Sequence, residues 1–276
     1  MTSDPHHDHA IDCVQAGVLV RPLELGTAVV TGKDRQGWLN GMVTCELASK
    51  KPGDAAFGLL VTKAGKIQSE LYVLAADDEL WLGCYADRTP AVIEELDRHL
   101  IMEDAEIARV EPAPTWMLAL GAGAPAARDA ARGAGGRAGL ITRGGVPALV
   151  VAAPAGAEQA VRDAVLAAVS PSAIATEGAW DRARVEHGIT AFGVDFDDTN
   201  YPQEASLERD AVSFEKGCYL GQEAVFMLEK RGHVKKRIVQ LHVDGAVETG
   251  DPITLPDGAE VGRITSRAVR PAGGRL

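Results

Sequence analysis

The sequence predicts an α+β fold with two similar halves, followed by a small all-β part. Expected strands and helices alternate irregularly and include hairpins, which disfavours a doubly wound parallel sheet. An order of strand, helix, hairpin and helix occurs once before residue 113 and once after it. Short strands punctuated by Gly and Pro follow at small-barrel spacing. Two ferredoxin-like halves packed around a shared cleft would account for this order.

The first half, residues 16–112, follows a polar tail, residues 1–15, that is expected to be disordered. Asp34 stands at the N-cap of an expected helix whose buried face carries Trp38, Leu39 and Met42. A second helix starts at Thr89-Pro90, because Pro is favoured at the first helical position. Strands are expected at 28–30, 56–62, 67–75 and 80–84.

The second half, residues 113–232, repeats this organisation and adds a long loop. Strands are expected at 116–120, 139–143 and 148–152, and helices within 121–136, at 158–169, from Thr176-Glu177 to Gly188 and at 222–231. The acidic segment 189–214 between the last two helices contains Phe192, Phe196 and Tyr201, which favours an ordered, functional loop. Residues 233–276 carry the expected strands of a partial C-terminal β-barrel, at 238–243, 253–255 and 261–264.

Composition limits the function classes. The chain has 276 residues and a net charge of −11, which argues against direct binding to nucleic acid. It has neither a membrane-length apolar run nor the hydrophobic core of a signal peptide, so we expect a cytoplasmic protein without membrane contact. The four cysteines are far apart, which predicts neither a metal site nor a disulfide framework.

The segment Lys216-Gly217-Cys218-Tyr219-Leu220-Gly221-Gln222-Glu223 is the most informative part of the chain. It places Cys218 between a cation and the start of an amphipathic helix, where backbone N–H groups favour negative charge. The plain alternative is that Cys218 is a small buried apolar residue. The nearby Lys216, the flexible glycines and the helix start together favour a lowered thiol pKa and a reactive thiolate.

This segment resembles the signature of the YgfZ family of folate-binding iron–sulfur cluster maintenance proteins, which is related to the aminomethyltransferase (T-protein) of the glycine cleavage system. The resemblance covers the chain from about Val29 to the C-terminus. It implies a tetrahydrofolate, or another reduced folate, in a central cleft between the halves, with Cys218 as the functional residue. It also implies iron–sulfur client or assembly proteins as partners and a transient iron–sulfur intermediate.

The resemblance suggests further cofactor-binding residues. These are Lys216, Gly217, Tyr219, Gly221, Gln222 and Glu223 in the signature, with Arg184, Asp195 and Glu204 in the stretch before it. Asp195 and Glu204 are the candidate acceptors for the pterin amino group, because a buried donor needs an acceptor. The alternative is that both carboxylates are solvated loop residues.

Three departures from the resemblance matter. Ser69 stands where aminomethyltransferases carry the catalytic carboxylate, and strand alternation is expected to point Glu70 to the opposite face. Met227 occupies a position where relatives commonly carry Arg. The chain also ends before the last expected barrel strands, so a truncated barrel is expected.

Three functions therefore remain in competition. The first is a folate-dependent accessory factor for assembly or repair of iron–sulfur clusters, including those of radical enzymes that modify tRNA. The second is a folate-dependent aminomethyl- or methyltransferase with an unusual acid, and the third is a non-catalytic folate sensor. The basic run from Lys230 to Arg237 is either a solvated surface or an attractor for the glutamyl tail of a folate.

Overall fold

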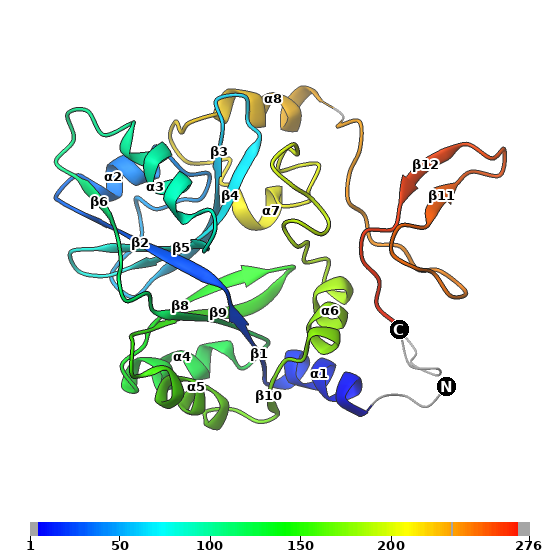
Figure 1. The fold of residues 1–276 in the computed structure, drawn as a ribbon, viewed down its shortest axis with the longest axis horizontal. Helices are drawn as coiled ribbons and strands as arrows, with labels where there is room; N and C mark the ends of the chain where they lie inside the picture. The colour runs from blue at the N-terminus through cyan, green and yellow to red at the C-terminus, as the bar shows by residue number, and fades with distance from the viewer. Residues whose placement is uncertain (1–4, 233, 270–276) are drawn as a thin grey trace.

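The computed structural model describes residues 5–232 and 234–269, which form two five-stranded sheets with helices around them and a C-terminal hairpin (Figure 1). The strands are β1 (Val18–Leu23), β2 (Leu25–Thr31), β3 (Ala55–Val61), β4 (Ile67–Ala75), β5 (Leu80–Tyr85), β6 (Glu106–Arg109), β7 (Thr115–Leu120), β8 (Arg137–Arg143), β9 (Val146–Ala153), β10 (Ser172–Ile174), β11 (Pro252–Thr254) and β12 (Glu260–Arg263). The helices are α1 (Pro5–Ala16), α2 (Arg35–Asn40), α3 (Thr89–Asp97), α4 (Ala124–Gly133), α5 (Glu158–Ala167), α6 (Glu177–Glu186), α7 (Glu208–Ala211) and α8 (Gln222–Arg231). The mixed α and β class is confirmed.

The two sheets do not divide the chain at one point. The first sheet has the order β3-β4-β5-β2-β6 and is antiparallel throughout. The second has the order β10-β1-β7-β9-β8, in which β1 pairs parallel with β10 and antiparallel with β7. Strand β1 therefore belongs to the second sheet although it precedes the whole first sheet in sequence. The expected boundary at residue 113 does not separate the two sheets.

Helices cover the outer faces of both sheets (Figure 1). Leu39 of α2 and Val92 and Leu96 of α3 are buried against the first sheet. On the second sheet, alanines of α4 and valines of α5 form the outer core. Each helix buries residues at the spacing of one helical face, as its apolar pattern predicts.

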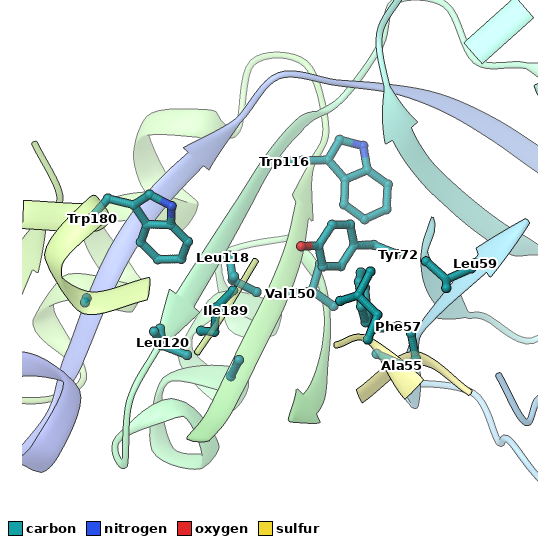
Figure 2. Packing of buried hydrophobic residues seen from close by; sticks show 14 of the residues in the cluster. Ala55, Phe57, Leu59, Tyr72, Trp116, Leu118, Leu120, Val150, Trp180 and Ile189 are labelled. Atoms are coloured by element: carbon teal, nitrogen blue, oxygen red, sulfur yellow. The ribbon is translucent and has the colours of Figure 1, made fainter. Parts of the chain in front are cut away.

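The inner faces of the two sheets share a third core (Figure 2). Phe57 and Tyr72 of the first sheet pack in it with Leu118 and Val150 of the second. The indole of Trp116 is fully buried and donates to the hydroxyl of Thr27 at 2.8 Å, which joins the sheets by a buried hydrogen bond. Close contact between the halves therefore replaces an open cleft over this area.

The N-terminal tail was expected to be disordered, but helix α1 forms most of it. Its Ala10, Cys13 and Val14 are buried, and they follow the spacing of one helical face. The helix packs against α6 and against the inner core. The polar residues 6–9 before this stripe dominate the composition of the segment, which explains the wrong prediction.

The C-terminal part is less regular than predicted. Strands β11 and β12 form a two-stranded antiparallel sheet, and the other residues described after α8 are not in strands. The expected strand 238–243 is not formed, and Val239, Leu241 and Val243 are exposed. The barrel prediction is therefore not confirmed within the described residues. In the same ranges, no helix is both long and apolar enough to cross a bilayer.

Candidate functional site

The signature loop is fixed to the loop after α2 by Lys216. Its Nζ donates to the carbonyl oxygens of Asn40 at 2.7 Å, Val43 at 2.9 Å and Cys45 at 2.5 Å. An ammonium group has three donors, and all three are used here. Burial lowers the pKa of Lys216. Lys216 therefore anchors the loop and has no N–H group left to donate to Cys218.

Cys218 is exposed, whereas the other three cysteines are buried. Helix α8 begins at Gln222 with Gly221 as N-cap, so Cys218 lies three residues before the cap rather than next to it. Gly221 has φ 78°, and a Cβ there would collide with the carbonyl oxygen of Thr62. This glycine therefore lets α8 start directly against the β3–β4 turn.

The other signature residues surround this anchor. Tyr219 enters the inner core, and burial raises the pKa of its hydroxyl well above its usual range. The Gln222 amide donates to the carbonyl oxygen of Gly217 at 3.4 Å, within the loop. Gly217 has open space around its Cα, and Glu223 lies in the first turn of α8. The loop thus carries one buried aromatic residue and one exposed thiol.

Arg184 and Asp195 form a closed network away from the signature loop. Arg184 Nη1 lies 2.8 Å from Asp195 Oδ2, and both side chains are buried. Asp195 also accepts from the backbone of Ala191 and from the hydroxyls of Thr265 and Ser266. Both carboxylate oxygens are thus engaged, and the network holds the C-terminal segment onto α6 and the 189–214 loop.

Glu204 is only partly engaged. Its Oε2 accepts from the backbone N–H of Tyr201 at 2.9 Å and lies 3.6 Å from Lys66 Nζ. The Lys66 ammonium also lies 3.3 Å from the centroid of the Tyr201 ring. The neighbouring Gln203 donates to the carbonyl oxygen of Val225 in α8. Glu204 therefore stabilises the turn at residues 200–204, which contacts both the start of β4 and α8.

A β-bulge in β4 turns Glu70, rather than Ser69, toward the inner core. Counting by twos from the inward-facing Ile67 would place Ser69 on the inner face. The register shifts opposite Leu60 and Val61, so one extra residue is inserted between Ile67 and Ser69. Glu70 then shares the inner face with Tyr72, whereas Ser69 donates to the carbonyl oxygen of Glu70. The two residues do lie on opposite faces, but the carboxylate is the inward one.

Glu70 is part of a buried polar cluster that sequence reasoning missed. The Tyr85 hydroxyl donates to Glu70 Oε2 at 2.9 Å, and Arg143 Nη2 lies 3.5 Å from Glu70 Oε1. The Arg143 guanidinium lies 3.6 Å from the centroid of the Phe57 ring. Glu70 and Arg143 are 5% and 3% exposed, so this pair is removed from bulk water. Sequence reasoning missed it because the bulge that turns Glu70 inward is defined by the pairing of β3 with β4.

The cluster retains unused hydrogen-bonding capacity. Burial raises the pKa of Glu70, although Arg143 and the Tyr85 hydroxyl oppose this shift. Glu70 Oε1, Arg143 Nε and Arg143 Nη1 are buried without a hydrogen-bond partner in the described structure. Buried polar atoms without a hydrogen bond are costly, and in a native protein a catalytic role or a bound water or ion can account for them. The cluster therefore offers one acceptor and two donors in a low-dielectric setting.

The segment before the signature connects the cluster to the loop. Asp210 of α7 accepts from the backbone N–H of Gly144, directly after Arg143, at 2.7 Å. Phe192 lies 5.6 Å from the Tyr85 ring and 4.3 Å from the Arg88 guanidinium. The 189–214 loop therefore covers the cluster on its Tyr85 side.

Two openings lie at the surface around the sheets. A groove of about 420 Å³ between α3 and the β3–β4 turn is lined by Thr62, Gln68, Arg88 and Asp198, among others. Its Arg88 is the residue that stacks on Phe192. A smaller cleft of about 220 Å³ is lined by Arg132 and Arg137. The larger opening therefore adjoins the cover of the polar cluster, and Cys218 lines neither one.

Within residues 5–232 and 234–269, no group of three or more His, Cys, Asp or Glu side chains could hold a metal ion.

Known proteins resemble the chain over most of its length. It is 29% identical to the mitochondrial aminomethyltransferase of Gallus gallus, over 89% of this chain and 69% of that enzyme. It is 26% identical to the tRNA-modifying protein YgfZ of Vibrio vulnificus, over 83% of this chain and 71% of the relative. A shorter match, 39% identical over 31% of the chain, covers 20% of the mitochondrial iron–sulfur cluster assembly factor IBA57 homologue of Chaetomium globosum.

Other comparisons address fold and length. The glycine cleavage system aminomethyltransferase T from Bartonella henselae superposes with a TM-score of 0.71 at 16% identity, over 95% of this chain and 76% of that one. At this identity the likeness shows the fold alone. The chain spans 64% of the length of a related chloroplastic protein of Arabidopsis thaliana. No family model matches the chain.

These findings define a protein with the aminomethyltransferase fold. The similarity to YgfZ, to an IBA57 homologue and to an aminomethyltransferase agrees with the resemblance carried by residues 216–223.

Proposed function

We propose that the protein is a folate-binding accessory factor for assembly or repair of iron–sulfur clusters, with Cys218 as its reactive residue. The observation that carries this proposal is the anchored loop, in which three Lys216 hydrogen bonds hold the exposed Cys218 in place. The names of the YgfZ and IBA57 relatives support the iron–sulfur and tRNA-related setting. The cytoplasmic location stays a prediction, because relatives include mitochondrial and chloroplastic proteins.

Glu70 is a better acceptor for the pterin amino group than Asp195 and Glu204, the two carboxylates predicted from the sequence. Asp195 is fully engaged, and Glu204 is held by its own turn. A pterin edge presents N–H donors and a carbonyl acceptor, which complement the Glu70 oxygen and the Arg143 nitrogens that make no hydrogen bond in the described structure. Glu70 and Arg143 would hold the ring, with Phe192 as its cover. Bound folate supplies one-carbon carrier chemistry.

The proposed role of Cys218 is to provide one ligand to a transient iron–sulfur intermediate. Clusters usually need four protein ligands, and a soft thiolate is the preferred type. A single cysteine therefore requires the partner protein to supply the remaining ligands. Its exposure on an anchored loop allows such sharing.

Complementation tests this proposal. Cells that lack the protein should lose activity of iron–sulfur enzymes, including radical enzymes that modify tRNA, and the wild-type gene should restore it. Cys218→Ser should fail, whereas Cys13→Ala, which removes a buried thiol, should still restore activity. Full rescue by Cys218→Ser would count against the proposal.

One observation favours a second candidate, a folate-dependent aminomethyl- or methyltransferase. The inward Glu70 supplies the carboxylate that Ser69 cannot. Turnover of a methylamine donor with tetrahydrofolate, abolished by Glu70→Gln and retained by Ser69→Ala, would support this activity. Absence of turnover in a folate-binding protein leaves the accessory role or that of a folate sensor.

A further inference from the structure

The loop between α3 and β6 displays two large apolar side chains in solvent. Ile101 is 83% exposed and Met102 is 92% exposed, the highest values among the large hydrophobic residues that the structure describes. A single exposed apolar residue is ordinary. Two adjacent ones at the tip of a loop present a compact apolar knob. Figure 1 shows this loop on the opposite side of the molecule from β11 and β12.

Hydrogen bonds fix this knob. The backbone N–H groups of Ile101 and Met102 both donate to Glu103 Oε2, at 3.1 and 3.0 Å. These bonds lower the pKa of Glu103, so the carboxylate stays ionised at neutral pH. The clamp leaves the two side chains pointing outward in a loop of defined shape.

The base of the loop is also held. Asp34, the predicted N-cap of α2, makes no side-chain cap bond and instead accepts from the backbone of Asp104 at 2.8 Å. The Trp38 indole donates to the carbonyl oxygen of His99 at 3.3 Å. Because the backbone is already ordered, binding through the knob would cost little conformational entropy.

Negative charge surrounds the knob. Residues 94–106 contain six carboxylates and one arginine, and Asp97, Glu103 and Glu106 are exposed. Arg98 is already paired with Glu94 and Glu95, and Lys33 with Asp104 at 3.0 Å. This rim would repel an anionic membrane and favour a partner of opposite charge.

We propose that the knob of Ile101 and Met102 docks into an apolar pocket of a partner protein whose pocket is bordered by Lys and Arg. Apolar anchors inside a charged rim are the usual arrangement of an interaction hot spot. The proposal is independent of folate binding, since it uses neither the polar cluster nor the signature loop.

The first test is site-specific photocrosslinking in the natural host. The full-length protein carries p-benzoylphenylalanine at position 102 or, as control, at position 261, since Val261 is 57% exposed at the opposite end of the molecule. The proposal predicts one dominant protein adduct from position 102 only. Adding Asp97→Lys and Glu106→Lys should reduce its yield about tenfold, because opposite charges guide encounter and register.

The second test measures affinity for the identified partner by calorimetry. Ile101→Ser/Met102→Ser should weaken binding by about 30-fold or more, as expected for truncated hot-spot residues. Leu255→Ser/Val261→Ser removes two partly exposed apolar side chains elsewhere on the surface and should leave affinity unchanged. The proposal is overturned by equal adducts at both positions, by an adduct with lipid or with a second copy of this chain, or by insensitivity to charge reversal.

Discussion

The ammonium group of Lys216 donates a 2.5 Å hydrogen bond to the carbonyl oxygen of Cys45, 171 residues earlier in the chain. With its two further bonds to Asn40 and Val43, it joins the signature loop to the loop after α2. The signature lysine is therefore a structural anchor, and the thiol two residues later is presented to solvent by that anchor.

Replacing Lys216 tests the anchor. Lys216→Met removes three hydrogen bonds and leaves carbonyl oxygens without their partner, which should lower the free energy of unfolding by about 2 kcal/mol. Lys216→Arg, which keeps the charge and the donors, should lose less. Urea unfolding measures both. Equal stability of wild type and Lys216→Met would contradict the anchoring role.

Thiol accessibility separates Cys218 from the other three cysteines. Burial raises the pKa of Cys45 to about 11 and also raises those of Cys13 and Cys84. Since the thiolate is the nucleophile, the folded protein at pH 8 should take up one maleimide, at Cys218, and the denatured protein four. Mass spectrometry of the digested adducts reads this out. Labelling of Cys45 or Cys84 in the folded protein at a similar rate is the opposing result.

The buried carboxyl of Glu70 should make stability depend on pH. Its pKa in the folded state is raised above the ordinary 4.5, so the folded state holds this proton more tightly than the unfolded chain. Its stabilising contribution is complete below pH 4.5 and is lost as pH rises through the folded-state pKa. Relative to Glu70→Gln, the wild type should lose stability as pH increases from 4.5.

Denaturant unfolding of the wild type and Glu70→Gln over a pH series checks this sign. Glu204→Gln provides the matched control, because it makes the same change to a carboxylate outside the polar cluster, in the turn at Tyr201. A stability difference that stays flat with pH, or that grows in favour of the wild type, would show that burial does not dominate at Glu70.

The basic run offers a test of the folate tail. Lys235 and Lys236 are exposed, whereas Arg237 is paired with Glu208. Lys235→Glu/Lys236→Glu should weaken a polyglutamylated reduced folate several-fold more than its monoglutamate, since added carboxylates meet reversed charge. Titrations with both ligands at low salt measure the ratio. Equal weakening would assign the run to an ordinary solvated surface.

Local signals in the sequence predicted most of the regular elements. Thr176 caps α6 by accepting from the backbone of Ala179, and Pro90 stands in the first turn of α3, as predicted. Strands β3, β4 and β5 lie within a residue of their expected ranges. Such features depend on neighbours in sequence, which is why propensity and periodicity find them.

Long-range features could not be predicted in this way. Strand β1 joins the second sheet through pairing with residues about 100 positions away. The direction of Lys216 depends on carbonyl groups near residue 43, and the inward turn of Glu70 depends on a bulge opposite Leu60. Cys218 was predicted from its motif. Predicting the polar cluster would have required the register of β3 with β4 and the position of Arg143.

The central claim is that Glu70 and Arg143 together bind the ring of a reduced folate. Calorimetric titration with tetrahydrofolate tests it most directly, using the wild type, Glu70→Gln and Glu204→Gln. Loss of a hydrogen bond to a charged group predicts about 10- to 100-fold weaker binding for Glu70→Gln and unchanged binding for Glu204→Gln. Wild-type affinity in Glu70→Gln, or no binding by the wild type, would contradict the claim.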